Sequence, residues 1–292
     1  MDIRAIAMGL AFAAMWSSAF TSARIIVADA PPLTSLSLRF LISGLLGVAI
    51  ARWLGQNWHM TPAQWRATIL FGLCQNALYL GLNFVAMQTI EASLAAIIAS
   101  SMPLLVGLAG AALLHERIGA LGFAGLLGGV AGVALIMGTR LEGGADIYGL
   151  ILCVLGVLAL TAATLAVRGA ISGGNLLMVV GLQMLVGSAA LALVGWTTEP
   201  FVVNWSWKLG AAFAYTTLVP GLGATLVWFS LVNRVGATRA ATFHFLNPFF
   251  GVTIAALILG ESLRIWDIVG VLIVTAGILA VQMSRHAVPD RA

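Results

Sequence analysis

Small polar side chains lie next to two prolines that fall in the middle of long apolar segments. Ser100 and Ser101 precede Pro103, and Asn247 precedes Pro248. A proline removes one backbone hydrogen bond and bends its helix, and freed carbonyl groups are tolerated in a membrane where they line a cavity or meet protein partners. We therefore predict that Ser100, Ser101 and Asn247 contact a substrate and that both prolines act as hinges. The alternative is that these side chains satisfy the kinked backbone and bond one helix to another.

One histidine lies inside an apolar segment. His244 precedes Pro248 by four residues. Because imidazole titrates near physiological pH, His244 is a candidate substrate contact and the one candidate proton carrier. The alternative is a neutral imidazole that forms hydrogen bonds between helices.

A polar stripe runs through the apolar segment 65–88. Asn76, Tyr79 and Asn83 are spaced by three and four residues, which places them on one face of a helix. Polar groups that face lipid are costly, so we assign the stripe to the protein interior. We predict that Tyr79 and Asn83 line a substrate cavity.

Aromatic and hydroxyl side chains in other segments extend this predicted wall. Trp16 and Phe243 would give it an aromatic lining, and Ser17 and Thr164 would add polar contacts. Such a cavity suits an amphipathic substrate with a flat hydrophobic side chain. The alternatives are that aromatic residues pack the helices together, which we favour for Trp228, and that the hydroxyl groups bond their own helix.

Charged and metal-binding residues are scarce within the apolar segments. No Asp or Glu lies at the middle of a segment, so we do not expect a proton relay of carboxylates or a sodium site. Cys74 and Cys153 lie in separate segments, and no HExxH motif or cluster of His or Cys is present. We therefore expect no catalytic residue, no metal and no cofactor. Arg39 lies about two turns into its segment, where it can extend to the membrane surface or bind a substrate carboxylate.

Composition identifies the elements that must position these residues. The chain has 292 residues, of which 61% are hydrophobic and 8% are charged, whereas soluble domains have about 25% charged residues. A membrane-spanning helix needs about 20 apolar residues, and we find ten such segments, which leave no room for a soluble catalytic domain. The segments are 4–27, 33–53, 65–88, 92–114, 120–138, 147–168, 176–196, 208–233, 237–259 and 265–284. We predict an all-α integral membrane protein with ten transmembrane helices.

Basic residues indicate the orientation of the chain. Ten spans place both tails on one side, and that side carries nine of the 14 Lys and Arg residues. The positive-inside rule then places both termini in the cytoplasm. The basic residues are scattered, and no Lys/Arg-rich run of the kind that tracks nucleic acid is present, so we expect no nucleic acid partner.

The chain aligns with itself at an offset of 145 residues. This register pairs Pro103 with Pro248 and Glu116 with Glu261. It indicates one transmembrane domain, residues 1–292, made of two repeats that cover about 1–145 and 146–292, with five helices each. An odd number of helices forces the second repeat to enter from the opposite face. Inverted repeats are typical of secondary transporters, although apolar helices of low complexity can also align by chance.

The fifth segment carries a row of glycines spaced by three and four residues. They are Gly119, Gly122, Gly125, Gly129 and Gly132. Small residues let helices approach closely. We expect this face to make a contact inside the protein rather than between two copies.

Four short motifs carry a resemblance to a known family. They are Trp16-Ser17-Ser18-Ala19-Phe20, Leu38-Arg39-Phe40, Leu114-His115-Glu116-Arg117-Ile118 and Leu259-Gly260-Glu261-Ser262-Leu263. Together with the length and the repeat, they resemble the EamA branch of the drug/metabolite transporter superfamily. Within that branch the chain resembles the bacterial aromatic amino acid exporters of the YddG type. His115 departs from the pattern, because the family usually has Gly before this Glu.

The resemblance implies ten helices, cytoplasmic termini and a central path for metabolite export. We accordingly expect a multi-pass protein of the bacterial inner membrane that exports aromatic or other neutral amino acids and related small metabolites. Alternating access through a largely uncharged cavity would be the mechanism. Small-molecule substrates and the lipid bilayer are the expected partners, and a monomer is expected rather than a homodimer. The alternatives are a channel-like facilitator of small neutral solutes and an intramembrane enzyme, which would need a catalytic set that we do not find.

Overall fold

The computed structural model describes residues 3–113, 119–166, 175–236, 240 and 242–286, so Glu116 and its motif lie outside the described residues. Within these ranges all regular elements are helices, which confirms the predicted all-α membrane fold. Nine described helices are long and apolar enough to span a membrane, and Phe243–Leu259 is a shorter apolar helix. The described elements are α1 (Ile3–Asp29), α2 (Pro32–Trp53), α3 (Pro62–Phe71), η1 (Gly72–Tyr79), α4 (Leu80–Ala86), α5 (Ala92–Ser100), α6 (Met102–Leu113), α7 (Ala120–Glu142), α8 (Ile147–Ala166), α9 (Leu176–Thr198), α10 (Trp207–Thr216), η2 (Thr217–Gly223), α11 (Ala224–Val235), η3 (Thr242–Leu246), α13 (Asn247–Leu259) and α14 (Ile265–His286).

Two spans contain a stretch of π-helix, in which the backbone turns are wider than in an α-helix. The stretch η1 interrupts the third span and η2 interrupts the eighth. Pro220 lies inside η2, and its missing N–H group accounts for a change in the hydrogen-bond pattern there. The offset of 145 residues takes the first residue of η1, Gly72, to the first residue of η2, Thr217.

The fourth and ninth spans are broken next to their prolines. A turn at Ser101 separates α5 from α6, and the 3₁₀ stretch η3 precedes α13. Pro103 and Pro248 are the second residues of α6 and α13, positions where a helix does not use the N–H group that proline lacks. Each proline therefore begins a new helix after a break and does not bend a continuous one.

The chain divides into two compact units, each of which takes helices from both halves of the sequence. Unit 1 comprises Met1–Thr21, Thr89–Leu150 and Gly223–Ala292, and unit 2 comprises Ser22–Gln88 and Ile151–Leu222. The units therefore do not coincide with the predicted repeats. The reason is that the fourth and fifth spans pack against the ninth and tenth, while the second packs against the seventh.

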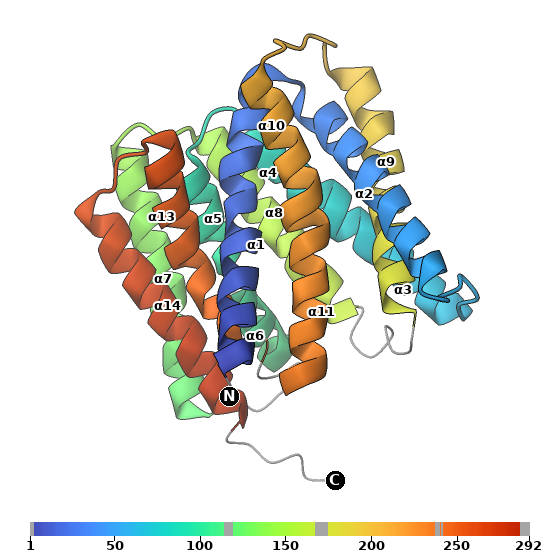
Figure 1. The fold of residues 1–292 in the computed structure, drawn as a ribbon. Coiled ribbons are helices and arrows are strands. Elements are labelled where there is room, and N and C mark those ends of the chain that lie inside the picture. Colours follow the sequence, from blue (N-terminus) through green and yellow to red (C-terminus); the bar gives the residue numbers. More distant parts are fainter. Residues whose placement is uncertain (1–2, 114–118, 167–174, 237–239, 241, 287–292) are drawn as a thin grey trace. The chain divides into compact units, whose positions relative to one another are not determined.

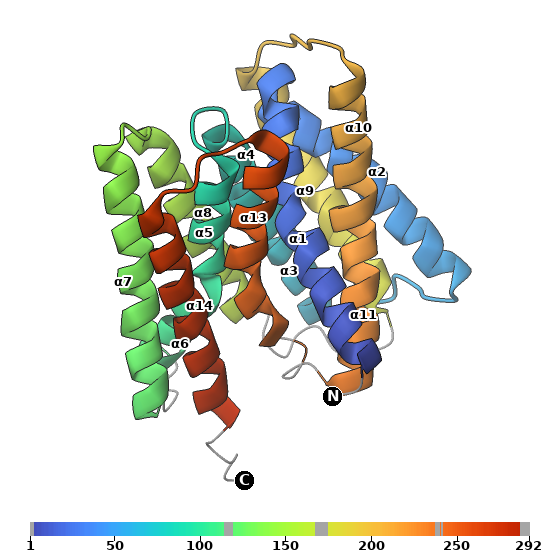
Figure 2. The same ribbon diagram turned by 60° about the vertical axis from the view of Figure 1, so that its left-hand side comes forward.

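In unit 1, α7 and α14 lie side by side along much of their length, as Figures 1 and 2 show. The glycine face of α7 forms this contact. A Cβ atom at Gly277 of α14 would lie 2.6 Å from the carbonyl oxygen of Gly125 and 2.9 Å from the Cα atom of Gly129. The face is therefore used inside the protein, as expected, and apolar side chains such as Leu126 and Ile278 fill the space beside it.

In unit 2, α2 packs closely on α9. A Cβ atom at Gly181 would lie 2.8 Å from the backbone nitrogen of Val48. Ser37 and Ser188 each donate a hydroxyl hydrogen bond of 2.8 Å to the other's carbonyl oxygen. These reciprocal bonds satisfy both buried hydroxyl groups at the interface of the two helices.

Side chains from distant loops cap the helix ends of unit 2. The carboxylate of Glu199, just after α9, accepts hydrogen bonds from the backbone amides of Leu33 and Thr34 in α2, at 2.7 and 2.8 Å. The amide oxygen of Gln56, just after α2, accepts from the backbone amide of Met178 in α9, at 2.9 Å. Because the first amides of a helix have no partner inside it, each of the two helices stabilises the start of the other.

Candidate functional site

A cluster of aromatic rings lies in unit 1, where α1, α11 and η3 meet. The Phe12 ring centroid lies 4.7 Å from that of Trp228, 5.2 Å from that of His244 and 5.8 Å from that of Trp16. Trp228 and His244 are in edge contact at 5.1 Å. The cluster thus contains Trp16 and His244, which the sequence indicated, and Phe12 at its centre, which it did not. The available signal was that Phe12 precedes Trp16 by four residues and shares its helix face.

Polar groups of Asn247 border the aromatic cluster. Its amide nitrogen lies 3.0 Å from Nδ1 of His244, and its backbone carbonyl accepts a hydrogen bond of 3.2 Å from the hydroxyl of Ser17. When the amide donates to Nδ1, the imidazole is the neutral tautomer with its proton on Nε2. The Oδ1 atom of Asn247 is buried and has no hydrogen-bond partner among the described residues. An acceptor is therefore left free beside a set of aromatic faces.

Phe243 takes a different place from its neighbour His244. Its side chain is 6% exposed and forms a core cluster with Ala5, Leu231 and Ala240. A Cβ atom at Gly9 would lie 2.3 Å from the Phe243 ring. The ring is therefore packed tightly against a glycine of α1, and Trp228 packs against the same core cluster. A contact of Phe243 with a substrate remains a prediction.

Tyr79 and Asn83 lie in unit 2. Both are buried, with 3% and 1% of their surface exposed, as is Asn76 of the same stripe. The amide of Asn83 donates to the carbonyl of Tyr79 at 2.8 Å and accepts from the Cys153 thiol at 3.4 Å. Asn76 donates to the carbonyl of Gln183 at 2.9 Å. The stripe therefore faces the interior, where its amides join the third span to α8 and α9.

Three of the four predicted hydroxyl contacts use their own helices in this structure, whereas Ser17 donates to the Asn247 carbonyl. The hydroxyl groups donate to the carbonyl three or four residues earlier: Ser100 to Ala96 at 2.7 Å, Ser101 to Ile98 at 2.6 Å and Thr164 to Leu160 at 2.7 Å. Such bonds are the usual alternative to a ligand contact for serine and threonine in helices. Contacts of these three residues with a substrate remain predictions.

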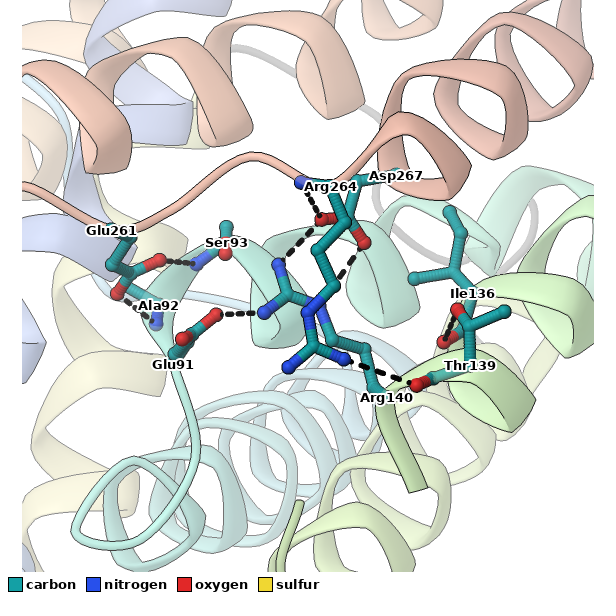
Figure 3. A network of polar contacts seen from close by, with 9 residues as sticks. All are labelled: Glu91, Ala92, Ser93, Ile136, Thr139, Arg140, Glu261, Arg264 and Asp267. Carbon is teal, nitrogen blue, oxygen red and sulfur yellow. Dashed lines mark hydrogen bonds and ion pairs between the residues drawn. The ribbon is translucent and has the colours of Figure 1, made fainter. Parts of the chain in front are cut away.

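A buried ionic network in unit 1 was not anticipated, because its members lie at the ends of their spans. Arg140 at the end of α7 donates from Nε and Nη2 to the two carboxylate oxygens of Asp267 in α14, at 3.0 and 2.7 Å. Its Nη1 atom also pairs with Glu91, just before α5. Figure 3 shows the guanidinium between the two carboxylates. Arg140 is 3% exposed and Asp267 is fully buried.

The network continues through the loop between α13 and α14. The carboxylate of Glu261 accepts from the first two backbone amides of α5, at 2.7 and 2.9 Å (Figure 3). Asp267 also accepts from the Arg264 amide at 2.9 Å, and the Arg264 side chain donates to the Thr139 carbonyl at 3.1 Å. These bonds connect one end of α5, one end of α7 and one end of α14. We refer to this network of Glu91, Arg140, Glu261, Arg264 and Asp267 as the clasp of unit 1.

The described residues include no group of three or more His, Cys, Asp or Glu side chains that could hold a metal ion. The carboxylates of the clasp instead accept hydrogen bonds from Arg140 and from backbone amides. The clasp can therefore hold helices together, whereas the aromatic cluster of unit 1 contains a buried acceptor, Oδ1 of Asn247, that has no partner among the described residues.

Comparison with known proteins shows matches over almost the whole chain. The model of the EamA-like transporter family matches twice, over residues 3–138 and 147–283. The chain is similar to the uncharacterized transporter YvbV of Bacillus subtilis (strain 168), with 26% identity over 94% of this chain and 90% of that protein. It is also similar to the uncharacterized transporter sll0355 of Synechocystis sp., with 26% identity over 88% of this chain and 83% of that protein. One solved crystal structure matches its fold with a TM-score of 0.67 and 20% identity, and the match covers 98% of this chain and 99% of that one.

Proposed function

Since the chain belongs to the EamA-like transporter family, we propose that it is a secondary transporter that exports neutral amino acids and related small metabolites across the bacterial inner membrane. That it is a membrane transporter of small solutes follows from the family and from relatives that are named transporters. The proposal adds the substrate class, the direction, the cytoplasmic position of both termini and a monomeric state.

The aromatic cluster of unit 1 is the observation that supports the substrate class. Phe12, Trp16 and Trp228 can contact a flat hydrophobic side chain by stacking or by edge contact. The free Oδ1 atom of Asn247 can accept a hydrogen bond from the ammonium group of an amino acid. No described carboxylate takes part in this cluster. Aromatic amino acids are therefore the substrates that suit the cluster best.

We propose alternating access through two inverted repeats as the transport mechanism. The family model matches once on each side of residue 145. The offset of 145 residues superposes the two π-helical stretches, and also the two breaks that precede Pro103 and Pro248. A helix with a break can change its angle there at little cost in hydrogen bonds. Paired breaks in the two halves support hinges that act in turn on the two sides of the membrane.

Binding of radiolabelled L-tryptophan to purified protein tests the substrate class. Replacing Trp228 with Ala removes one ring from the cluster, and we expect the affinity to fall about two- to thirteenfold, because an aromatic pair contributes about 0.5–1.5 kcal/mol beyond its buried area. Trp205→Ala is the matched control, since Trp205 is 83% exposed in a loop. Equal affinities of the Trp228 variant and the wild type would contradict the assignment of the cluster as a binding site.

A further inference from the structure

Arg39 in α2 is a cation buried inside unit 2. It lies seven residues after the first residue of α2, about 10 Å along the helix axis, and only 5% of its surface is exposed. The side chain therefore does not extend to water at the membrane surface. A charged group at this depth of a span is costly unless it is paired.

The described contacts of Arg39 leave most of its charge without a partner. Its Nε atom donates to the Thr216 carbonyl at 3.2 Å, and its Cζ atom lies over the Phe40 ring, 5.0 Å from the centroid. A guanidinium has five N–H donors. Within the described part of the chain no carboxylate lies within 4.0 Å of it, since both ion pairs found there belong to Arg140. Arg140, buried to a similar extent, pairs with two carboxylates, whereas Arg39 pairs with none of the described ones.

The π-helical stretch η2 explains one of the five donors. Pro220 has no N–H group for the carbonyl four residues earlier, that of Thr216, and in a π-helix that carbonyl accepts instead from the amide five residues later. The Nε atom of Arg39 donates to the same Thr216 carbonyl, and the hydroxyl of Ser43, one turn further along α2, donates to the Thr217 carbonyl at 3.2 Å. The four N–H groups on the Nη atoms take no part in these bonds.

Gly221 of η2 lies close to this part of α2. A Cβ atom at Gly221 would lie 3.2 Å from the Ser43 hydroxyl, 3.2 Å from the Thr216 carbonyl oxygen and, at an ordinary contact distance, 3.8 Å from Nη2 of Arg39. At the matching position of the other half, reached at an offset of 144 residues, the chain has neutral Gln183, so the charge is a feature of the first half alone.

We propose that the Nη groups of Arg39 form a site within unit 2 for the carboxylate of a transported solute. A planar guanidinium binds a carboxylate with two parallel hydrogen bonds, and the ligand would supply the negative charge that the described residues of unit 2 do not provide at this point. This inference rests on the proposed transport function and narrows it to substrates that carry a carboxylate. A hydrogen bond to the Thr216 carbonyl alone would not require a charge.

Two indole probes test the proposal on detergent-purified full-length protein, with thermal stabilisation as the readout. Indole-3-propionate carries a carboxylate and no ammonium group, and tryptamine carries the reverse. We expect Arg39→Gln to weaken the apparent affinity for indole-3-propionate by about tenfold or more, because a charge-assisted hydrogen bond is lost. The apparent affinity for tryptamine should be unchanged. Ser43→Ala is the matched control, because it removes the neighbouring bond to η2 without changing the charge. The proposal is overturned if Arg39→Gln weakens both probes equally or neither.

A second variant and a second anion make the result decisive. Arg39→Lys keeps the charge but lacks the planar guanidinium, so this variant should retain part of the preference for indole-3-propionate over tryptamine. It tests the proposal even if Arg39→Gln does not fold. Chloride in place of gluconate tests for an inorganic anion. If chloride stabilises the protein in a way that depends on Arg39, while the carboxylate of indole-3-propionate has no such effect, the proposal is overturned.

The same assay separates this inference from the proposed function. If the wild type binds no amino acid but retains a preference for indole-3-propionate that depends on Arg39, the anion site stands and amino acid transport is refuted. If L-tryptophan binds and Arg39→Gln leaves the ratio of the affinities for L-tryptophan and tryptamine unchanged, amino acid transport stands and the anion site is refuted.

Discussion

The clasp of unit 1 allows a sharp test of what its buried ion pair contributes. Asp267→Leu leaves the guanidinium of Arg140, which is 3% exposed, with Glu91 as its remaining acidic partner, and Arg140→Leu leaves a fully buried carboxylate without its cation. Breaking a buried pair from one side costs about 3–5 kcal/mol, whereas replacing both partners by apolar residues of similar size is often neutral. We therefore expect each single variant to be strongly destabilised and the double variant to recover most of the loss.

Thermal unfolding in detergent measures this cycle. A loss of 1 kcal/mol lowers Tm by about 2–4 °C for chains of about 150–250 residues, so each single variant should lose about 6–20 °C and the double variant only a few degrees. Glu91→Gln is the control, because the Glu91 side chain is 39% exposed and pairs of that kind contribute about 1 kcal/mol or less. Additive losses in the double variant would refute the reasoning, since they would mean that the two side chains do not depend on each other.

Three further predictions concern packing, capping and acid stability. Gly277→Ala should lower Tm by several degrees, because its Cβ atom would lie 2.6 Å from a backbone carbonyl oxygen of α7. Gly138→Ala is the control and should leave Tm unchanged, because no atom lies within 4 Å of a Cβ atom there. Equal Tm values for the two variants would contradict the close contact. Glu261→Gln should speed hydrogen exchange at the first two amides of α5, which its carboxylate accepts, and unchanged exchange would contradict the cap. Hydrogen bonds from the Thr89 hydroxyl and then from backbone amides hold the pKa of Asp146 below its ordinary 3.8. The Asp146 carboxylate should therefore stabilise the fold above pH 3.8, and this effect should be lost as the pH falls through the lowered pKa. The difference in Tm between the wild type and Asp146→Ala, measured from pH 7 to 3, should be constant at first and shrink below about pH 4. A difference that grows in acid would contradict this prediction.

The spans were predictable because a bilayer imposes one dominant requirement, an apolar run of sufficient length. The predicted start of the fourth span, residue 92, coincides with the start of α5, and that of the tenth, residue 265, with the start of α14. A departure from a continuous helix at Pro103 and Pro248 was predicted as well, since proline cannot continue a helix in the ordinary way, but it was predicted as a bend, whereas the structure has a break followed by a new helix. The π-helical stretch η1 was not, because Gly72–Tyr79 contains no proline and depends on packing of Gly72 and Asn76 against Gln183.

Side-chain partners were harder to predict than spans. Arg140 and Asp267 are 127 residues apart, and charged residues at the ends of spans are expected to face headgroups and water, so nothing local indicates that they meet in the interior. Ser100 and Ser101 present the opposite difficulty. A serine can bond a ligand or its own helix, and the choice depends on what lies opposite, which spacing along the chain does not reveal.

The central claim is that the chain carries solutes by alternating access, and counterflow in proteoliposomes tests it most directly. Vesicles that contain purified protein and are preloaded with unlabelled L-tryptophan should take up external labelled L-tryptophan transiently above its equilibrium level, because a carrier with a closed intermediate exchanges one substrate for another. Saturable uptake with such an overshoot, absent from vesicles without protein, is the predicted result. Uptake that rises linearly with concentration and never exceeds equilibrium would contradict the account and identify a channel-like facilitator instead.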